Sequence, residues 1–171
     1  MSENMNEAAP KQTPSEDSAS TLARAIAEHS FWKGMSPEHL KILADSAMYS
    51  RFEAGQLIFE EGDPANRFYL ILEGKVVLES YVRERGTVLI ETIGAGDVLG
   101  WSWLFPPYYW HFDARALEPT KAIFFYGTRL RENCEEDHEF AFQLLRRTAE
   151  VAIKRLQATR RELLEAHHIK K

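Results

Sequence analysis

Hydrophobic and polar positions alternate through the middle of the chain, between residues 48 and 126. Glycine, proline and acidic residues interrupt the alternation at short intervals, as turn residues do between antiparallel strands. A two-residue period in many short runs predicts an antiparallel sandwich or barrel. Glu73 and Gly74 favour a two-residue hairpin, because glycine tolerates positive φ. The runs that predict strands are 48–52, 56–59, 68–72, 75–82, 87–93, 112–117 and 121–126.

Helical signals flank this β-rich region on both sides. Ser36 and Pro37 predict the start of a short helix, because serine caps helix N-termini and proline fits the first helical position. The first 18 residues are polar and have no period, which predicts a disordered tail. The predicted organisation is a tail at 1–18, N-terminal helices at 19–47, a β-roll at 48–126 and C-terminal helices at 127–169.

A heptad-like seam runs along the predicted last helix. Its apolar and small residues recur at alternating spacings of three and four, which is the pattern of a helix that packs along one stripe. We expect homodimerisation through this seam, and docking of the whole helix on its own body is the alternative. The seam residues are Phe142, Leu145, Ala149, Ala152, Leu156, Thr159, Leu163 and Ala166.

Composition narrows the class of protein. The 171 residues are 44% hydrophobic, which fits a globular chain. No apolar run approaches the roughly 18 residues of a membrane-spanning helix, and the polar N-terminus lacks the apolar core of a signal peptide. The single cysteine, Cys134, excludes an internal disulfide and a cysteine-only metal site within one chain. These features predict a cytoplasmic protein without membrane contact.

The net charge of −5 is unevenly distributed, because residues 141–171 contain eight basic and three acidic side chains. A basic helix lying against an acidic body explains the asymmetry, and a nucleic-acid-binding helix is the alternative. The acidic chain as a whole argues against the alternative. No nucleophile–base pair, phosphate loop or metal-spaced cluster is present, so we expect neither an enzyme nor a bound cofactor or metal.

Residues 57–76, LIFEEGDPANRFYLILEGKV, resemble the cyclic-nucleotide-binding domain of the Crp–Fnr superfamily. The shared features are Gly62 with Asp63, the apolar run 68–71, and Gly74. The resemblance extends over about residues 20–165. It implies a mainly β fold, a double-stranded β-helix or jelly roll, with N-terminal helices and a long C-terminal helix.

The same family binds its ligand through a second motif, which we call the cassette. In the family pattern, a Gly-Glu segment opens a short helix whose N–H groups bind the cyclic phosphate, and the glutamate binds the ribose. An arginine further along neutralises the phosphate. Here Gly100 and Leu104 match the pattern, but Trp101 replaces the glutamate and Trp110 replaces the arginine. Tight binding of cyclic AMP or cyclic GMP is therefore not expected.

Trp103, His111 and Phe112 have larger side chains than the residues at these positions of the family pattern. The aromatic side chains could fill the pocket as core, line a reshaped pocket for a flat or apolar ligand, or permit weak nucleotide binding. Arg115 could instead be structural, paired with Asp113 or Asp97. The candidate ligand-binding residues are Gly100, Trp101, Ser102, Trp103, Leu104, Trp110, His111, Phe112, Arg115 and Thr159.

Two of these candidates have a specific alternative role. Thr159 falls on the threonine that contacts the base in the family, and it also fits the helix seam. His111 could be a haem ligand, although a lone histidine beside aromatic side chains is typical of a core position.

The sequence supports three functions. The first is a stand-alone sensor with altered or lost nucleotide specificity that signals through its last helix. The second is a protein-interaction or structural module with a closed pocket, and the third is a protein related to transcription regulators. Because the chain ends at Lys171, without room for the family's helix-turn-helix, we expect no DNA binding by this chain alone. The expected partners are a small-molecule ligand, a second copy of the chain and a protein partner.

Overall fold

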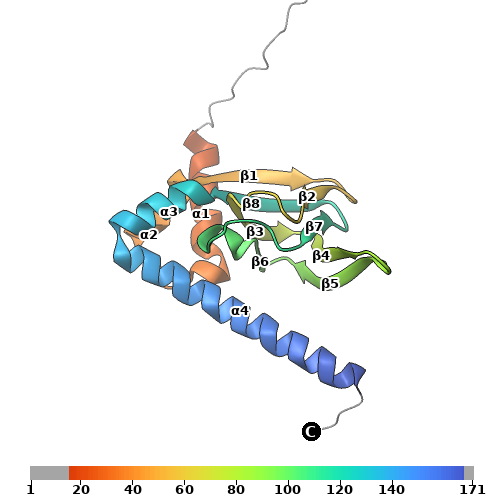
Figure 1. The fold of residues 1–171 in the computed structure, drawn as a ribbon. Helices are drawn as coiled ribbons and strands as arrows, with labels where there is room; N and C mark the ends of the chain where they lie inside the picture. Colours follow the sequence, from red (N-terminus) through yellow and green to blue (C-terminus); the bar gives the residue numbers. More distant parts are fainter. Residues whose placement is uncertain (1–15, 168–171) are drawn as a thin grey trace, which may run out of the picture.

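The chain forms a β-roll with helices at both ends (Figure 1). The computed structural model describes residues 16–167. The first helix begins inside the segment predicted as a disordered tail, whose residues 1–15 lie outside the described part. Acidic residue types are favourable in a first helical turn, which a criterion of overall polarity does not register. The N-terminal elements are α1 (Glu16–Glu28), the 3₁₀ helix η1 (Ser30–Trp32) and α2 (Pro37–Asp45).

The start of α2 follows the predicted capping pattern. The hydroxyl of Ser36 accepts a hydrogen bond from the His39 N–H at 3.2 Å, and Pro37 is the first helical residue. This capping prediction is confirmed.

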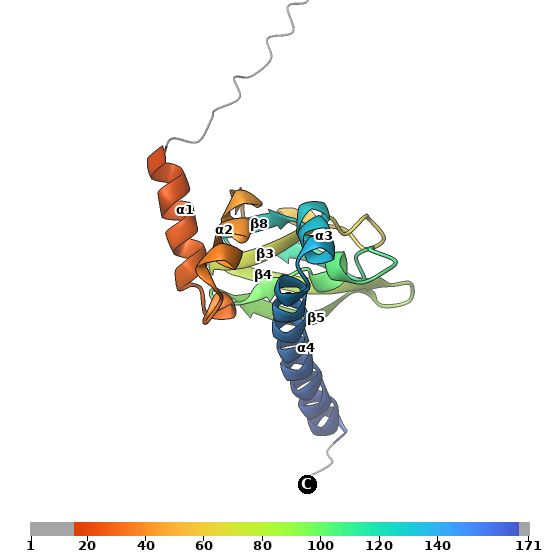
Figure 2. The same cartoon turned by 90° about the vertical axis from the view of Figure 1, so that its left-hand side faces the viewer.

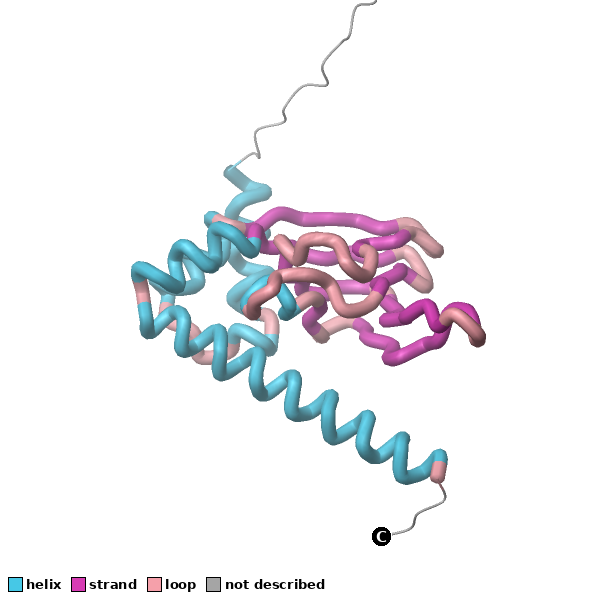
Figure 3. Tube along the Cα trace, in the orientation of Figure 1, coloured by secondary structure: helices cyan, strands magenta, loops and turns pink. Residues whose placement is uncertain are grey.

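Within residues 16–167, eight strands form two four-stranded antiparallel sheets, with the orders β1-β8-β3-β6 and β2-β7-β4-β5; Figures 1 and 3 show how the strands are arranged in the β-roll. The predicted mainly β jelly-roll fold is confirmed. Each of the seven predicted runs contains a strand, whereas β6 was missed because two residues show no period. The strands are β1 (Ala47–Phe52), β2 (Leu57–Phe59), β3 (Arg67–Glu73), β4 (Lys75–Val82), β5 (Gly86–Gly94), β6 (Val98–Leu99), β7 (Asp113–Ala116) and β8 (Thr120–Tyr126).

The hairpin predicted at Glu73 and Gly74 is wrong. β3 and β4 belong to different sheets, so the chain crosses between the sheets at Gly74. The glycine is still required, because its φ is +95° and an added Cβ would lie 2.5 Å from the Thr120 hydroxyl oxygen. A single left-handed residue thus redirects the chain instead of closing a two-stranded ribbon.

Two helices complete the fold, α3 (Gly127–Glu136) and α4 (His138–Ala166). Figures 1 and 2 show α4 extending away from α3 along one side of the β-roll. The helices are separated by Asp137, whose carboxylate accepts the Phe140 N–H at 2.9 Å and lies 3.0 Å from Nε2 of His39. The Phe140 N–H, followed by the His39 ring, lowers the pKa of Asp137. This residue therefore ties the start of α4 to α2.

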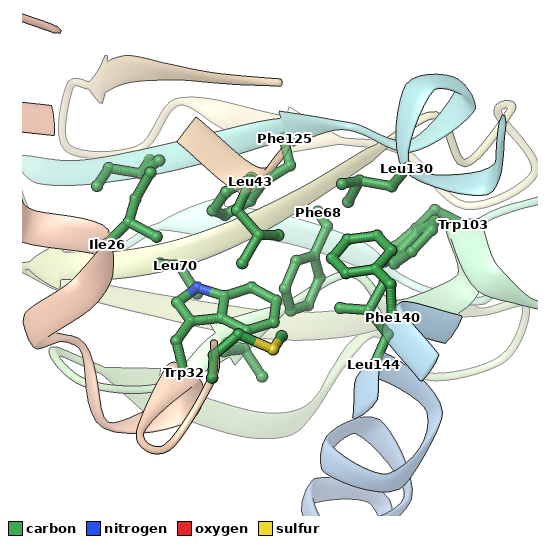
Figure 4. Close-up of a cluster of buried hydrophobic side chains, with 13 residues drawn as sticks. Ile26, Trp32, Leu43, Phe68, Leu70, Trp103, Phe125, Leu130, Phe140 and Leu144 are labelled. Atoms are coloured by element: carbon green, nitrogen blue, oxygen red, sulfur yellow. The ribbon is translucent and has the colours of Figure 1, made fainter. Parts of the chain in front are cut away.

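Strand β3 is buried on both faces and separates two hydrophobic clusters. Phe68 and Leu70 face the first cluster, which contains residues from the helices and which we call the helix-side core (Figure 4). Tyr69 and Ile71 face the second cluster, inside the β-roll, which we call the roll core. Burial on both faces explains why this stretch is continuously apolar in the sequence.

We predict that Gly74→Ala destabilises the protein more than Gly55→Ala. Both glycines have positive φ, but an added Cβ at Gly55 meets nothing within 4 Å. Left-handed strain costs about 1 kcal/mol at either site, and the clash with Thr120 adds about 1–3 kcal/mol at Gly74 only. Urea unfolding of both variants measures the difference. Equal losses of unfolding free energy would contradict the close packing described at Gly74.

Candidate ligand-binding site

The cassette begins at a glycine that is required by its surroundings. Gly100 has φ +88° and precedes η2 (Trp101–Leu104). A Cβ added here would lie 2.9 Å from Cη2 of Trp110 and 3.3 Å from the backbone oxygen of Arg67. The left-handed backbone and the lack of space both favour glycine. The matching Gly100 is therefore explained by the packing of this chain, whatever its ligand.

The loop that follows η2 is fixed against the turn that carries the family signature. The Ala65 N–H donates to the Tyr108 oxygen at 2.6 Å, and the Gly62 N–H donates to the Trp110 oxygen at 2.9 Å. The Trp110 N–H donates to the Asp63 oxygen at 3.0 Å. Backbone hydrogen bonds thus hold the two motifs predicted from the sequence side by side.

Two of the cassette tryptophans are core residues, in different clusters. Trp103 is 1% exposed and belongs to the helix-side core, with its ring centroid 6.0 Å from that of Phe68. Trp110 is 4% exposed and belongs to the roll core. Its ring stacks on Phe59 with 3.9 Å between centroids and 12° between planes. Trp103 is enclosed in its cluster, whereas Trp110, together with Phe59, also lines a pocket of about 350 Å³.

Trp101 has a different environment, because it is only partly buried and lies beside α4. The guanidinium of Arg155 lies 4.7 Å from the centroid of its ring. The same arginine donates a hydrogen bond to the Val98 oxygen, and its Nε lies 3.4 Å from the carboxylate of Glu91. Arg155 therefore links α4 to the strands and to the first residue of the cassette helix.

Arg155 and Glu91 were not among the site residues predicted from the sequence. Burial, opposed by Glu91 and Asp97, lowers the pKa of Arg155, and burial is the largest cause that raises the pKa of Glu91. Arg155 lies one helical turn before Thr159, so helical spacing could have placed it on the face next to that residue. No local pattern marks Glu91, because its role depends on the approach of α4.

The remaining candidates lie in several environments. Ser102 is buried, Leu104 packs on the helix-side core and Phe112 packs on the roll core. His111 and Thr159 are exposed. The structure thus gathers the first cassette residues around Arg155, whereas the polar candidates predicted to surround a ligand are dispersed.

Arg115 has a partner other than the two suggested by the sequence. Its Nε lies 2.8 Å from the carboxylate of Glu79, and its Nη1 donates to the Gly55 oxygen at 3.0 Å. Asp113 instead accepts the Glu61 N–H at 2.7 Å. In the β4–β7 register Arg115 is opposite Val77, so Glu79 is its diagonal neighbour on the same face. Pairing with Asp113 or Asp97 is therefore wrong.

In the described part of the chain, the surroundings of the single cysteine make its thiol a poor nucleophile. Burial, with Asp137 and Glu135, raises the pKa of the Cys134 thiol to about 11. Among the described residues, no group of three or more His, Cys, Asp or Glu side chains could hold a metal ion. No described helix is long and apolar enough to cross a membrane.

Comparison with known proteins shows the family. Residues 49–137, just over half of the chain, match the family described as cyclic nucleotide-binding domain. The chain therefore belongs to this family, and its fold is of the Crp–Fnr type. A CRP-like cAMP-activated global transcriptional regulator of Mycobacterium tuberculosis is 26% identical over 140 residues, which are 82% of this chain and 61% of that protein. The chain thus spans about three fifths of that relative's length.

Solved structures agree with this assignment. A putative cyclic nucleotide-binding protein from Geobacter metallireducens is similar with a TM-score of 0.72 and 28% identity, covering 78% of this chain and 97% of that one. The sensor domain of the transcriptional regulator DNR from Pseudomonas aeruginosa has a TM-score of 0.65 and 18% identity, covering 81% and 93%. The second likeness shows the fold alone.

We predict that Trp110→Ala destabilises the protein by about 3–5 kcal/mol, because it leaves a cavity in the roll core and removes the stack on Phe59. The neighbouring Tyr109 is 48% exposed, so Tyr109→Ala is a matched control with an expected effect within about 0.5 kcal/mol. Chemical unfolding measures both. A small effect at Trp110 would show that its indole is free to move out of the core.

Proposed function

We propose that this chain is a sensor module of the cyclic-nucleotide-binding type whose nucleotide specificity is altered or lost. The position of Trp110 carries the proposal. Where the family pattern has a phosphate-binding arginine, this chain has a buried indole stacked on Phe59. The position supplies no cation, and the indole that replaces the arginine is already engaged in the core.

The contact to the ribose is replaced as well. Trp101 stands where the pattern has glutamate, and an indole has no acceptor for a hydroxyl group. The Arg155 guanidinium lies against its ring. Each lost charge-assisted contact costs about 2 kcal/mol. Two losses correspond to about 1000-fold weaker binding of a cyclic nucleotide.

Signalling through α4 is the second part of the proposal. Arg155 holds α4 against the β-roll through the Trp101 ring, the Val98 oxygen and Glu91. A ligand that enters beside Trp101 competes for these contacts. Binding would therefore favour a different position of α4 over the one described.

A protein-interaction module with a closed pocket is the second candidate function. It is favoured by the burial of Trp103 and Trp110, which fill space beside the cassette with side chains. In this case α4 would act as a fixed docking surface and not as a moving element.

The partner that we propose for α4 is a second copy of the chain. Four large apolar side chains of the predicted seam are 46–69% exposed, and they are Phe142, Leu145, Leu156 and Leu163. The residues buried against the body, such as Phe140 and Leu144, lie on another face of the helix. An exposed apolar stripe of this length is typical of an interaction surface. The opposing docking hypothesis leaves these side chains without a role.

The mycobacterial relative is a cAMP-activated transcriptional regulator, and we extend to this chain only a regulatory role. A link to transcription would be a separate proposal that needs a DNA-binding partner or segment.

We expect no change in tryptophan fluorescence when cyclic AMP or cyclic GMP is added up to about 1 mM. Trp101 is the reporter, because it lies at the surface of the cassette next to Arg155. Calorimetry provides an independent measurement of binding. Saturable binding at micromolar concentration would contradict the loss of nucleotide recognition. Trp101→Phe is the control, because any signal that persists in it does not originate at this residue.

We predict that Leu156→Glu converts a dimer into a monomer, as measured by light scattering after size-exclusion chromatography. A charge at the centre of an apolar seam must be desolvated on association, which costs several kcal/mol when the charge is unpaired. The neighbouring Gln157→Glu is the matched control, because it adds the same charge to an exposed position outside the seam. A wild-type monomer at high micromolar concentration, or equal behaviour of both variants, would rule out the seam dimer.

A further inference from the structure

A pocket lined in part by Arg155 lies between η1, the β5–β6 region and the middle of α4. Its volume is about 600 Å³, which is within the usual range for small-molecule sites. The described residues that line it include none from the 100–115 segment and do not include Thr159. This pocket is therefore separate from the candidate site in the cassette, although Arg155 borders both.

Four basic side chains line this pocket, and they are Lys33, Arg147, Lys154 and Arg155. Arg147 is the most informative, because it is only 7% exposed. Its Nη2 donates to the Lys33 oxygen at 2.9 Å, but its Nε–H has no hydrogen-bond partner. Nη1 of Arg155 is also buried and unpartnered. Buried donors without acceptors are costly, and two of them belong to guanidinium groups of residues that line this one pocket.

The acidic side chains of the pocket do not supply these acceptors. Glu91 pairs with Arg155, and Glu150 lies 3.8 Å from Arg146 on the surface of α4. The carboxylate of Asp97 accepts the Gly94 N–H at 3.0 Å. Within residues 16–167, no ion pair engages Lys33, Arg147 or Lys154. The pocket therefore combines unpaired cations with carboxylates that still have free lone pairs.

We propose that this pocket binds a small phosphate-bearing metabolite, with Arg147 as the principal ligand of the phosphate. A guanidinium offers a planar fork of donors that matches a phosphate group, and Lys33 and Lys154 add positive charge at the exposed rim. The carboxylates of Glu91 and Asp97 accept hydrogen bonds from hydroxyl groups. This combination fits a sugar phosphate better than an isolated inorganic anion.

Such a ligand would contact both η1 and α4. The Arg147 side chain already reaches η1 through the Lys33 oxygen, which follows that helix directly. Occupancy would stabilise the described position of the middle of α4. The effect is opposite to that of a ligand in the cassette, which competes for Arg155.

Titration of the full chain with ribose 5-phosphate and with inorganic phosphate, followed by NMR of the arginine Nε–Hε groups, tests this proposal. The Arg147 signal reports on the unpartnered donor itself. We expect a saturable shift with ribose 5-phosphate at sub-millimolar concentration and at least tenfold weaker binding of inorganic phosphate. Equal affinity for ribose 5-phosphate and inorganic phosphate would support an oxyanion site but contradict a preference for sugar phosphates. No shift up to 10 mM, or an equal shift with chloride, would overturn the site.

Point variants distinguish binding at a specific site from a general effect of positive charge on the protein. Lys33 and Lys154 are exposed, so the double variant Lys33→Ala/Lys154→Ala is expected to fold and to weaken ribose 5-phosphate binding at least tenfold. Arg161→Ala removes one exposed charge from α4 outside the pocket and is expected to bind normally. Arg147→Lys keeps the charge but loses the planar fork, so its binding is also expected to fall. Unchanged affinity in the double variant would contradict the proposal.

This test is independent of the proposed function of the cassette. Cyclic nucleotide binding is measured by the fluorescence of Trp101, whereas ribose 5-phosphate binding is measured by the NMR signal of Arg147. Displacement of ribose 5-phosphate by cyclic AMP would show that both ligands use one site, and it would overturn the inference of a separate pocket.

Discussion

The burial of Trp103 unites the cassette with the helices at both ends of the chain. Its indole lies in the helix-side core with residues such as Trp32 and Phe140, as Figure 4 shows, and its backbone oxygen accepts a hydrogen bond from Arg131. Gly127 makes this packing possible, because a Cβ there would lie 3.0 Å from the Cβ of Trp103. A cassette anchored by a buried indole cannot shift alone, so its position is coupled to that of the helices.

A cation from α4 contacts the aromatic cassette. The family pattern places a cation on the strand side, at the position of Trp110, but this chain presents one from α4, at Arg155. The guanidinium is held by a ring, a carboxylate and a backbone oxygen. Burial lowers the pKa of Arg155, and Glu91 and Asp97 oppose the shift. Arginine has a very high intrinsic pKa, so the group remains charged, and its desolvation is offset by these contacts.

The sequence predicted the fold well because its signals are local. Alternation and turn residues locate seven strands, and the continuous apolar run at 68–71 reflects a strand buried on two faces. Trp103 and Trp110 enter different hydrophobic clusters and Trp101 enters neither, and no periodicity in the sequence encodes these positions. The hairpin at Gly74 failed for the same reason, since positive φ fixes a turn but not the sheet that receives the next strand. Arg147 and Arg155 line one pocket only because α4 lies beside the β-roll, and no local pattern encodes that approach.

Helix α4 presents two sets of residues on separate faces. Arg147 and Arg155 face the body, whereas Ala149 and Leu156 belong to the exposed seam. Each residue advances by about 100° around a helix, so the two sets are fixed relative to each other by the geometry of the helix. A change in the contacts of Arg155 therefore cannot reposition one face without moving the other. For a straight helix held at its first turn by Asp137 and Phe140, the displacement grows towards Leu163, where the seam is farthest from the body. A change in the contacts near the middle of α4 would thus move its far end the most.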